Sequence, residues 1–333
     1  MRVLVAVILS LWAVAAHAQD WEDRRVFGDG ARVLRILSST DTVFVAPIIA
    51  RFIAARPGVS VEYLVTGTAD LDRLFRADPG GYDAVISSAM DLQLRLANDG
   101  LARRLTARPG DLPDWAQWRQ SLFAFTSEPA AIVLRRDAFE GRDLPRSRQE
   151  LIEALRARPE VFRGRIGTYD VRRSGLGYLF ATQDARASET YWRLMEVMGR
   201  LDLRLYCCSG DMIDDLASGD LLVAYNVLGS YAAARVAAED DGLAIILPSD
   251  FPTMMMRSVL VSRDAAQPAL AEAFVSHLLA EQSAPGAPLP PLARGTGASI
   301  PLDAALLTFL DRLKRRTFLE EWENAAIQSA PDG

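Results

Sequence analysis

The sequence predicts an α/β fold of two doubly wound lobes joined by two extended hinge crossings. Its 333 residues suit two domains of ordinary size. In the first third of the chain, strand-like segments alternate with helical ones, which is typical of a parallel sheet covered by helices. Two later segments, residues 122–134 and 253–261, are extended and long for single strands. We therefore expect the chain to leave lobe one and return to it, with a cleft between the lobes.

The first lobe is predicted to begin with three strand–loop–helix units. Each strand is a run of aliphatic and β-branched residues, and each following segment has apolar residues at helical spacing. The polar loops between them lie at the carboxyl ends of parallel strands, where such sheets bind ligands. The predicted strands are residues 32–37, 59–65 and 82–86, and the predicted helices are residues 43–55, a segment from Leu71 and a segment after Asp91.

The second lobe and the tail continue this alternation. We assign residues 19–125 and 255–333 to lobe one and residues 126–254 to lobe two. A loop rich in Pro and Gly covers residues 283–301. The predicted helices are residues 147–158, a segment after the loop 170–177, 188–200, 211–218, a segment from Ser230, 266–281 and 303–325, and the predicted strands are residues 166–169, 221–226 and 243–247.

Residues 1–18 have the pattern of a cleaved secretory signal peptide. A short apolar run follows Arg2, and Ala16-His17-Ala18 fits the small-residue cleavage rule. The run is short for a bilayer span of about 20 residues, so an uncleaved membrane anchor is the weaker alternative. The residue directly after Ala18 is glutamine and not cysteine, which argues against a lipoprotein anchor. We expect an exported, periplasmic protein that is cleaved after Ala18.

The composition excludes several classes of function. The chain has two histidines, and His17 lies in the expected leader, which leaves His277. We therefore expect neither a histidine-rich metal site nor catalysis by several histidines, and we predict no metal and no cofactor. A net charge of −6 without a basic stripe makes nucleic acid a poor partner. Because Lys314 is the single lysine, a bound anion would have to use arginine.

Three loops rich in hydroxyl groups precede predicted helices in the first lobe. The free N–H groups and the positive end of a helix attract an anion. One such loop alone is better explained as an ordinary helix cap. Three of them on neighbouring strands favour a shared ligand site, whose candidate residues are Ser39, Thr40, Asp41, Thr66, Gly67, Thr68, Ser87 and Ser88.

The loop that leads into the helix near residue 175 carries the strongest signal for an anion. Arg172 and Arg173 precede Ser174 and Gly175 at the predicted helix start. A guanidinium and the N–H groups of that start would together hold an anion. The alternative is a solvated basic turn. The GxxxxGK[ST] spacing is absent, which excludes a P-loop.

Two further residue pairs are candidates for the site. Tyr225 and Asn226 end a predicted strand and would face the cleft, unless Tyr225 belongs to the core. Cys207 and Cys208 are adjacent, and an oxidising compartment favours disulfides. Adjacent Cα atoms lie about 3.8 Å apart, below the usual range of roughly 4.4–6.8 Å for a disulfide. A strained vicinal disulfide and two reduced thiols therefore both stay open.

Three short segments, together with the leader, resemble the type 2 periplasmic solute-binding proteins of ABC transporters. They are Ser-Ser-Thr-Asp at 38–41, the crossing segment at 125–133 and Tyr-Asn-Val-Leu-Gly-Ser at 225–230. The branch they resemble holds ferric-ion, phosphosugar and phosphoglycerate-type members, and the resemblance covers residues 30–328. It implies two α/β lobes that close on a ligand by hinge bending.

The resemblance also implies uptake of a small solute through an ABC-transporter permease. The hydroxyl-rich loops and the arginines favour a phosphorylated or carboxylated anion. A ferric-ion-binding protein is one alternative, although no Tyr-Tyr pair like that of the iron-binding members occurs here. A regulatory ligand sensor that partners a two-component sensor kinase is another. An enzyme is not expected, because Ser174 lies in no GxSxG turn and His277 lies on a distant helix. We expect a monomer.

Overall fold

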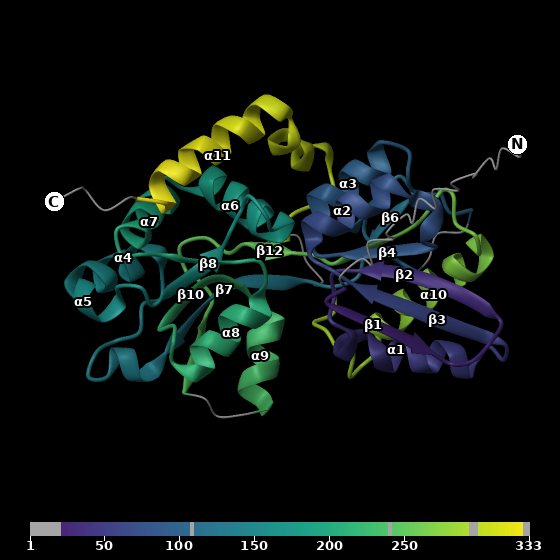
Figure 1. Ribbon diagram of the computed structural model, residues 1–333, viewed down its shortest axis with the longest axis horizontal. Helices are drawn as coiled ribbons and strands as arrows, with labels where there is room; N and C mark the ends of the chain where they lie inside the picture. The colour runs from purple at the N-terminus through teal and green to yellow at the C-terminus, as the bar shows by residue number, and fades with distance from the viewer. Residues whose placement is uncertain (1–20, 107–109, 239–241, 293–298, 329–333) are drawn as a thin grey trace, which may run out of the picture.

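The computed structural model describes residues 21–106, 110–238, 242–292 and 299–328, which form two α/β lobes side by side (Figure 1). The predicted two-lobe α/β architecture is confirmed. The expected leader, residues 1–18, and its cleavage point lie outside the described residues. Across the described ranges, no helix has both the length and the apolar character needed to cross a membrane.

Lobe one is built on a seven-stranded sheet in the order β1-β3-β2-β4-β13-β6-β5. The parallel pairs β2–β3 and β2–β4 form its middle, as the strand–loop–helix units predict. Strand β13 runs antiparallel to β4 and β6, and with it the chain returns from lobe two. The strands are β1 (Asp23–Phe27), β2 (Arg32–Ser38), β3 (Val59–Val65), β4 (Ala84–Ser87), β5 (Gln117–Trp118), β6 (Leu122–Ala124) and β13 (Ser258–Val261).

Helices cover both faces of this sheet. Successive strand residues point to opposite faces, so Ile36 packs in the core beneath α1 and α10, whereas Leu37 packs beneath α2 and α3. Between α1 and α10, Phe52 and Phe274 meet edge to face with ring centroids 5.2 Å apart. The helices are α1 (Thr42–Ala54), α2 (Thr68–Ala77), α3 (Met90–Asn98) and α10 (Pro268–Ser283), with the short 3-10 helices η1 (Pro79–Gly81) and η2 (Asp114–Ala116).

Lobe two is built on a second sheet in the order β11-β7-β10-β8-β9, with β12 paired to β7 beside this path. Strand β8 is parallel to β9 and β10, whereas β7 is antiparallel to β10, β11 and β12. The sheet is therefore mixed, with its parallel part at the β8 side. The strands are β7 (Glu128–Arg135), β8 (Ile166–Tyr169), β9 (Arg204–Tyr206), β10 (Val223–Leu228), β11 (Leu243–Ile246) and β12 (Met254–Met255).

The helices of lobe two form a second core with this sheet. Their apolar faces pack on β7, β8 and β10, and the aromatic side chains of Phe162, Tyr191 and Tyr225 are buried there. The helices are α4 (Arg148–Ala157), α5 (Pro159–Phe162), α6 (Gly175–Ala187), α7 (Thr190–Gly199), α8 (Ser209–Ser218) and α9 (Gly229–Ala238), with the 3-10 helix η3 (Arg136–Phe139).

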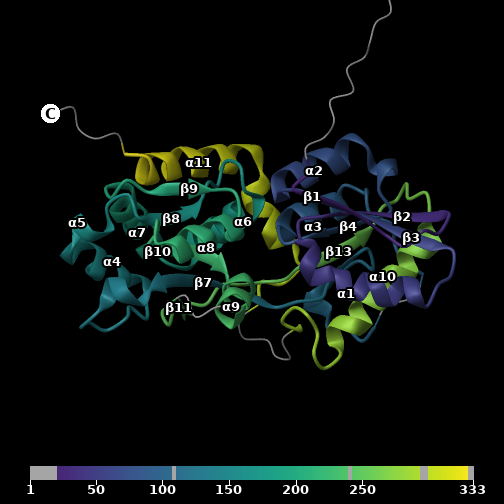
Figure 2. The ribbon, with the colours of Figure 1, turned by 60° about the horizontal axis from the view of Figure 1, so that its bottom comes forward.

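The C-terminal helix α11 (Arg312–Ala326) packs on lobe two (Figure 1, Figure 2). Phe318 lies against Tyr178 and Trp192, with ring centroids 5.5 and 5.4 Å away. The assignment of residues 255–333 to lobe one is therefore wrong for this helix. The helix predicted at 303–325 is also two elements, because Asp311 caps the start of α11 after the 3-10 helix η4 (Ala304–Leu310).

Neighbouring strands connect the two lobes. The chain leaves lobe one between β6 and β7 and returns between β12 and β13. Strand β12 pairs with the start of β7, Met254 with Pro129 and Met255 with Glu128, so the two crossings run side by side. Because α11 lies on lobe two, the chain also passes between the lobes a third time, between α10 and α11.

Candidate functional site

A cavity of about 290 Å³ lies between the lobes. Its wall combines carboxylates, hydroxyls and thiols, and the described residues that line it include no arginine and no lysine. Lobe one contributes Glu22, Ser39, Asp41, Thr66, Gly67, Thr68 and Ser88, and lobe two contributes Tyr169, Ser174, Leu176, Cys207, Cys208, Ser209, Gly210, Asp211, Leu228 and Tyr231.

Strand-to-helix connections supply nearly all of this wall. In lobe one they are the loops β2–α1, β3–α2 and β4–α3, and in lobe two the loops β8–α6, β9–α8 and β10–α9. The carboxyl ends of the parallel strands in each sheet thus face the other lobe, which is the usual ligand position in open α/β sheets. Six helix N-termini lie around one cavity as a result.

Ser39 joins the loops of lobe one. Its hydroxyl accepts the N–H of Ser88 at 3.1 Å and lies 3.4 Å from the hydroxyls of Ser87 and Ser88. Thr40 and Ser87 were predicted ligand contacts, but both are buried beneath the wall. Thr40 Oγ1 accepts a bond from Arg257 Nη1 at 2.7 Å, and Ser87 Oγ accepts an N–H at the start of α3. These two hydroxyls therefore hold the loops in place.

The lobes contact each other at the rim of the cavity. On one side, Thr68 Oγ1 accepts the N–H of Leu176 at 3.1 Å. On another, the hydroxyl of Tyr231 accepts the N–H of Asp41 at 3.3 Å. Gly175 belongs to this contact and not to the wall, because a Cβ there would lie 3.1 Å from Thr68 Oγ1. Its prediction as a ligand residue is therefore corrected to a lobe–lobe contact.

This architecture matches that of solved structures. No protein-family model and no curated protein sequence matches the chain. The substrate binding protein of the ABC transporter from Agrobacterium tumefaciens is 30% identical and superposes with a TM-score of 0.82 over 91% of this chain and 98% of that one. The chain belongs to the substrate-binding proteins of ABC transporters.

More distant structures share the type 2 fold of this substrate-binding protein. AfuA from Actinobacillus pleuropneumoniae, with exogenous fructose-6-phosphate bound, is 15% identical, with a TM-score of 0.71 over 90% of this chain and 100% of that one. Iron-bound HitA from Pseudomonas aeruginosa is 14% identical, with a TM-score of 0.66 over 88% and 99%. A substrate-binding protein carries a small solute to a membrane permease, so this chain is not an enzyme.

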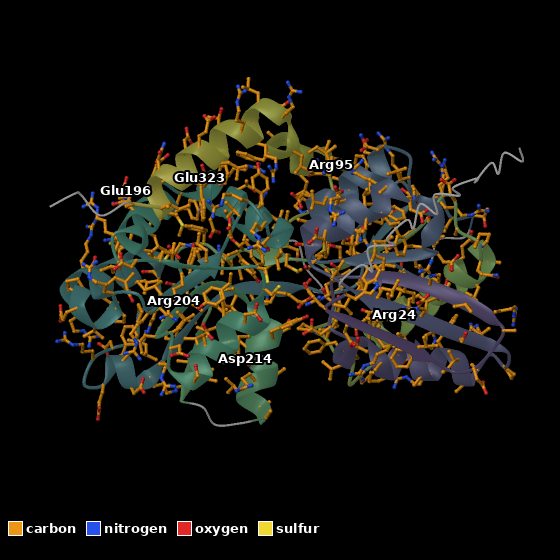
Figure 3. All side chains as sticks on the ribbon, viewed as in Figure 1. Arg24, Arg95, Glu196, Arg204, Asp214 and Glu323 are labelled. Carbon is orange, nitrogen blue, oxygen red and sulfur yellow. The ribbon has the colours of Figure 1, made fainter. Side chains whose placement is uncertain are left out.

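The two arginines before α6 do not line the cavity of this substrate-binding protein. Asp170 holds the guanidinium of Arg172 at 2.7 Å, and Arg172 Nη1 lies 3.4 Å from Glu323 on the outer helix α11 (Figure 3). Arg173 is exposed outside the wall. The carboxylate two residues upstream thus pairs with the arginine that was predicted to hold an anion. Of this loop, Ser174 lines the cavity, and its hydroxyl also caps α6.

Tyr225 and Asn226 lie in the core of lobe two, so their prediction as ligand residues is corrected. The Tyr225 hydroxyl donates to Asp184 Oδ2 at 2.6 Å and accepts from Arg148 Nε at 2.6 Å. Asn226 donates to the same carboxylate at 2.9 Å and has a positive φ of 64° where the β10–β7 register shifts. Strand β10 is central in its sheet, and the bulge at Asn226 lets both consecutive side chains reach Asp184.

Three carboxylates face the cavity, and sequence reasoning found Asp41 but missed Glu22 and Asp211. Glu22 lies beside the β3–α2 loop because strand β1, which was not predicted, runs antiparallel to β3. The N–H of Glu22 donates to the carbonyl oxygen of Val65 at 2.9 Å. Burial raises the pKa of Glu22, and Asp41 and Asp211 raise it further. Burial also raises the pKa of Asp41. The wall is therefore acidic, with no lining cation among the described residues.

Several other wall residues were also missed by sequence reasoning. The signal that could have found them is the one used for lobe one, namely a short polar segment between a strand and a helix. It applies to the segment after β9 and to the segment after β10. The missed residues are Tyr169, Leu176, Ser209, Gly210 and Leu228.

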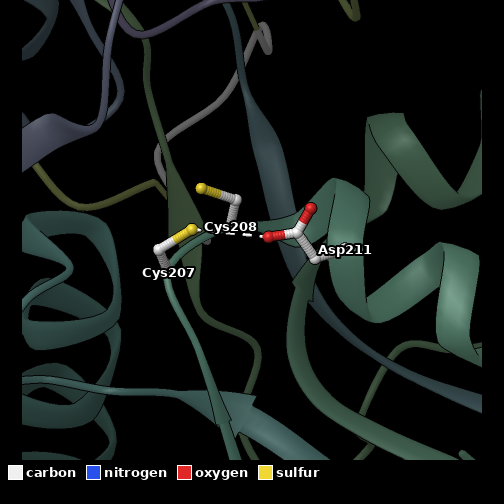
Figure 4. Close-up of side chains that lie close together, drawn as sticks. All are labelled: Cys207, Cys208 and Asp211. Atoms are coloured by element: carbon white, nitrogen blue, oxygen red, sulfur yellow. Dashed lines mark hydrogen bonds between the residues drawn. The ribbon is translucent and has the colours of Figure 1, made fainter. Parts of the chain in front are cut away.

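Cys207 and Cys208 lie between β9 and α8, on the wall that lobe two contributes (Figure 4). Both are free thiols in the structure. Cys207 Sγ donates to Asp211 Oδ2 at 3.4 Å. The hydrogen bond between the two thiols lowers the pKa of Cys207 and raises the pKa of Cys208, so one sulfur ionises well before the other.

Proposed function

We propose that this substrate-binding protein captures a small polar solute between its lobes in the periplasm and delivers it to the permease of an ABC transporter. The observation that carries the proposal is a cavity lined from both lobes at the carboxyl ends of their strands. A solute there contacts both walls when the lobes are together, so its binding favours the closed form. A volume of about 290 Å³ suits a small molecule or an ion.

Hinge bending at the two side-by-side crossings would open the cavity. Opening breaks the bonds Thr68–Leu176 and Asp41–Tyr231 at the rim. A hydrogen bond contributes about 0.5–1.5 kcal/mol net to stability. The lobes also pack through apolar side chains, such as Phe44 against Tyr231 with ring centroids 4.9 Å apart, so opening has to separate these surfaces as well. Binding energy from the solute favours the closed form only in so far as the solute contacts both walls.

The charge of the wall supports a solute that is cationic or rich in hydrogen-bond donors. Glu22, Asp41 and Asp211 supply negative charge and acceptors, and the arginines expected to hold an anion lie elsewhere. Repulsion between charges is strong in a partly buried site, which disfavours an anion beside three carboxylates. We therefore rank this class above the phosphorylated or carboxylated anion.

An anionic solute is the second candidate, supported by the six helix N-termini around the cavity. Each N-terminus carries about half a positive charge and free N–H groups. A ferric ion is less favoured: Tyr169 and Tyr231 line the cavity, but burial raises the pKa of both hydroxyls and so opposes the phenolate form.

Thermal-shift measurements on the purified protein test this ranking, with a panel of amines, polyols, carboxylates, phosphate esters and ferric ion. We expect a cationic or polyhydroxyl solute to raise the melting temperature, and Asp41→Asn to weaken its binding about tenfold, or 1.4 kcal/mol. Asp214→Asn is the matched control, because Asp214 lies 71% exposed on α8 outside the wall (Figure 3). Stabilisation by anions alone, strengthened in Asp41→Asn, would establish the second candidate, and no stabilisation by any class would refute capture.

The partner decides between transport and sensing. A regulatory protein would use the same capture step but present its closed form to a membrane sensor kinase. We expect the solute-bound protein to retain permease subunits from membranes of the source organism, whereas retention of a sensor kinase alone would favour the regulatory role. Light scattering of the same sample measures the mass, and we expect that of a monomer.

Export is proposed to remove residues 1–18. The positively charged start, the apolar run and Ala16-His17-Ala18 support cleavage after Ala18. Intact-mass measurement of protein recovered from the periplasm is expected to place the new N-terminus at Gln19. Recovery of the uncleaved chain in the membrane fraction would instead indicate an anchor.

A further inference from the structure

Cys207, Cys208 and Asp211 form a compact group of metal-type ligand atoms on the cavity wall (Figure 4). One ligand atom from each lies within 4.8 Å of the others, and Cys207 Sγ is 3.4 Å from Asp211 Oδ2. In a tetrahedral zinc site, with bonds of about 2.3 Å to sulfur and about 2.1 Å to oxygen, neighbouring ligand atoms lie about 3.6 Å apart. Shifts of about 1 Å would therefore let the group chelate one ion.

The local chain path creates this group. Strand β9 ends at Tyr206 and α8 begins at Ser209, so both cysteines occupy the connection, and Asp211 follows in the first helical turn. Cys208 is the N-cap of α8 and its side chain makes no capping bond. Thiolates are the ligands that soft cations prefer.

Lobe one faces this group with more negative charge. Glu22 and Asp41 line the same cavity as Cys207, Cys208 and Asp211. A bound divalent cation would relieve the repulsion between these negative charges. Glu22 would then be a fourth ligand, contributed from the opposite lobe.

The alternative chemistry of adjacent cysteines fits less well. In a vicinal disulfide the two Cα atoms lie about 3.8 Å apart. This Cα–Cα distance is shorter than the range that disulfides favour. Chelation asks for no such strain, because each sulfur needs only to reach the same ion.

We propose that the solute is a thiophilic divalent cation of the Zn²⁺ type, bound by Cys207, Cys208 and Asp211 of lobe two and by Glu22 of lobe one. This rests on the proposed function, since it names the solute that the cavity captures. The proposal differs from the expectation that the chain has no metal site. That expectation rested on the scarcity of histidines and on the absence of spaced cysteines. Binding displaces protons from the thiols, so affinity rises with pH.

Titration of the reduced, metal-free protein with Zn²⁺ by calorimetry, and with Cd²⁺ followed by its ultraviolet thiolate-to-metal absorption band, tests the site. We expect one ion per chain, proton release on binding, and the absorption band with Cd²⁺. The double variant C207S/C208S should lose the band and weaken Zn²⁺ binding by more than the roughly 10- to 100-fold that follows loss of an outer-sphere partner.

The carboxylates are tested with matched variants. Asp211→Asn should weaken Zn²⁺ binding at least about tenfold, whereas Asp214→Asn, one turn along α8, should bind as the wild type does. Glu22→Gln should reduce affinity while the Cd²⁺ band stays, because both sulfurs remain. Absence of the band in the wild type, or equal Zn²⁺ affinity in C207S/C208S, would overturn the proposal.

Solution scattering separates this inference from the proposed function. A metal-free solute that binds and compacts the protein, with no Zn²⁺ or Cd²⁺ binding, would refute the cation site and leave capture standing. Ion binding that depends on the cysteines but neither compacts the protein nor responds to Glu22→Gln would establish a lobe-two metal site and refute capture of that ion between the lobes.

Discussion

Arg257 and Glu128 form an ion pair with no exposed side-chain surface at the point where the two crossings meet. Arg257 Nε lies 2.7 Å from Glu128 Oε1, and its Nη1 donates to Thr40 Oγ1 at 2.7 Å. The N–H of Arg257 donates to Thr126 Oγ1 at 2.8 Å. Buried charges are tolerated when they are paired and fully hydrogen-bonded. This pair therefore ties the crossings to the β2–α1 loop that carries Ser39 and Asp41.

Removing one partner of this pair should destabilise the protein strongly. We expect Glu128→Gln to lower the free energy of unfolding by about 3–5 kcal/mol, because it leaves the Arg257 charge buried and uncompensated. Urea denaturation measures the change. Asp202→Asn removes one partner of an exposed pair with Arg163 and should cost at most about 1 kcal/mol. Equal effects of the two substitutions would contradict this role for the buried pair.

Asp91 in the first turn of α3 makes stability depend on pH. The residue is 2% exposed, its Oδ1 has no hydrogen-bond partner, and burial raises its pKa from 3.8 to about 7. Between these values the folded state binds more protons than the unfolded state, so stability falls as the pH rises.

We expect Asp91→Asn to remove this dependence. Relative to wild type, the variant should gain free energy of unfolding between about pH 4 and pH 7 and keep a constant gain above that, about 4 kcal/mol at most. Denaturant melts at a series of pH values measure it. Parallel profiles for the two proteins would show that Asp91 is not the titrating group.

Helix α11 packs on lobe two, although the elements β13 and α10 that precede it in the chain belong to lobe one. The chain has returned to lobe one through β13 and α10 before α11 begins. The aromatic side chains of α6 and α7 form an apolar surface on lobe two, and Phe318 and the fully buried Trp322 cover it. Burial of apolar area therefore decides the position of the helix.

Truncation of the Phe318 side chain tests whether apolar burial holds α11 on lobe two. We expect Phe318→Ala to lower the free energy of unfolding by about 3–5 kcal/mol, as for other buried aromatic side chains. Leu313→Ala on the same helix, at a position that is 61% exposed, should change it by no more than about 0.5 kcal/mol. Denaturant unfolding compares the two, and similar losses would mean that α11 is not anchored through Phe318.

At the scale of the whole molecule, two rigid cores meet around one polar cavity. Each lobe has its own buried cluster, a third cluster contains residues of both lobes, and the rim adds single hydrogen bonds such as Thr68–Leu176. Such bonds are weak beside the cohesion of either core. Relative movement of the lobes about their crossings is the large motion that would open the cavity.

Thr68→Val should shift the equilibrium toward the open form. It keeps the shape of the side chain but removes the acceptor for the Leu176 N–H, a loss of about 1 kcal/mol, or roughly a fivefold weaker apparent solute affinity. Solution scattering should show a larger radius of gyration without solute. Thr190→Val is the matched control, because Thr190 begins α7 away from the cavity. An unchanged radius and affinity in Thr68→Val would show that this bond does not hold the lobes.

Local pattern accounts for much of the fold and for part of the site. Strands β2, β3 and β4 and the helices after them follow from apolar spacing and polar loops, so the loops with Ser39, Thr66 and Ser88 were placed correctly at one edge. Strand β1 was missed, because its alternation is short and exposed. Glu22, which depends on it, was missed for the same reason.

The sequence alone determined most of the strands and helices, the two-lobe class and the polar loops of lobe one, because these depend largely on residues close together in the chain. The tertiary structure decided the charge of the cavity. Arg172 pairs with Asp170 and Glu323, whereas Glu22 and Asp211 meet from opposite lobes. Asp170 is two residues from Arg172, but the contacts Arg172–Glu323 and Glu22 opposite Asp211 join segments far apart in the chain, so they depend on distances across the folded molecule that local spacing does not fix.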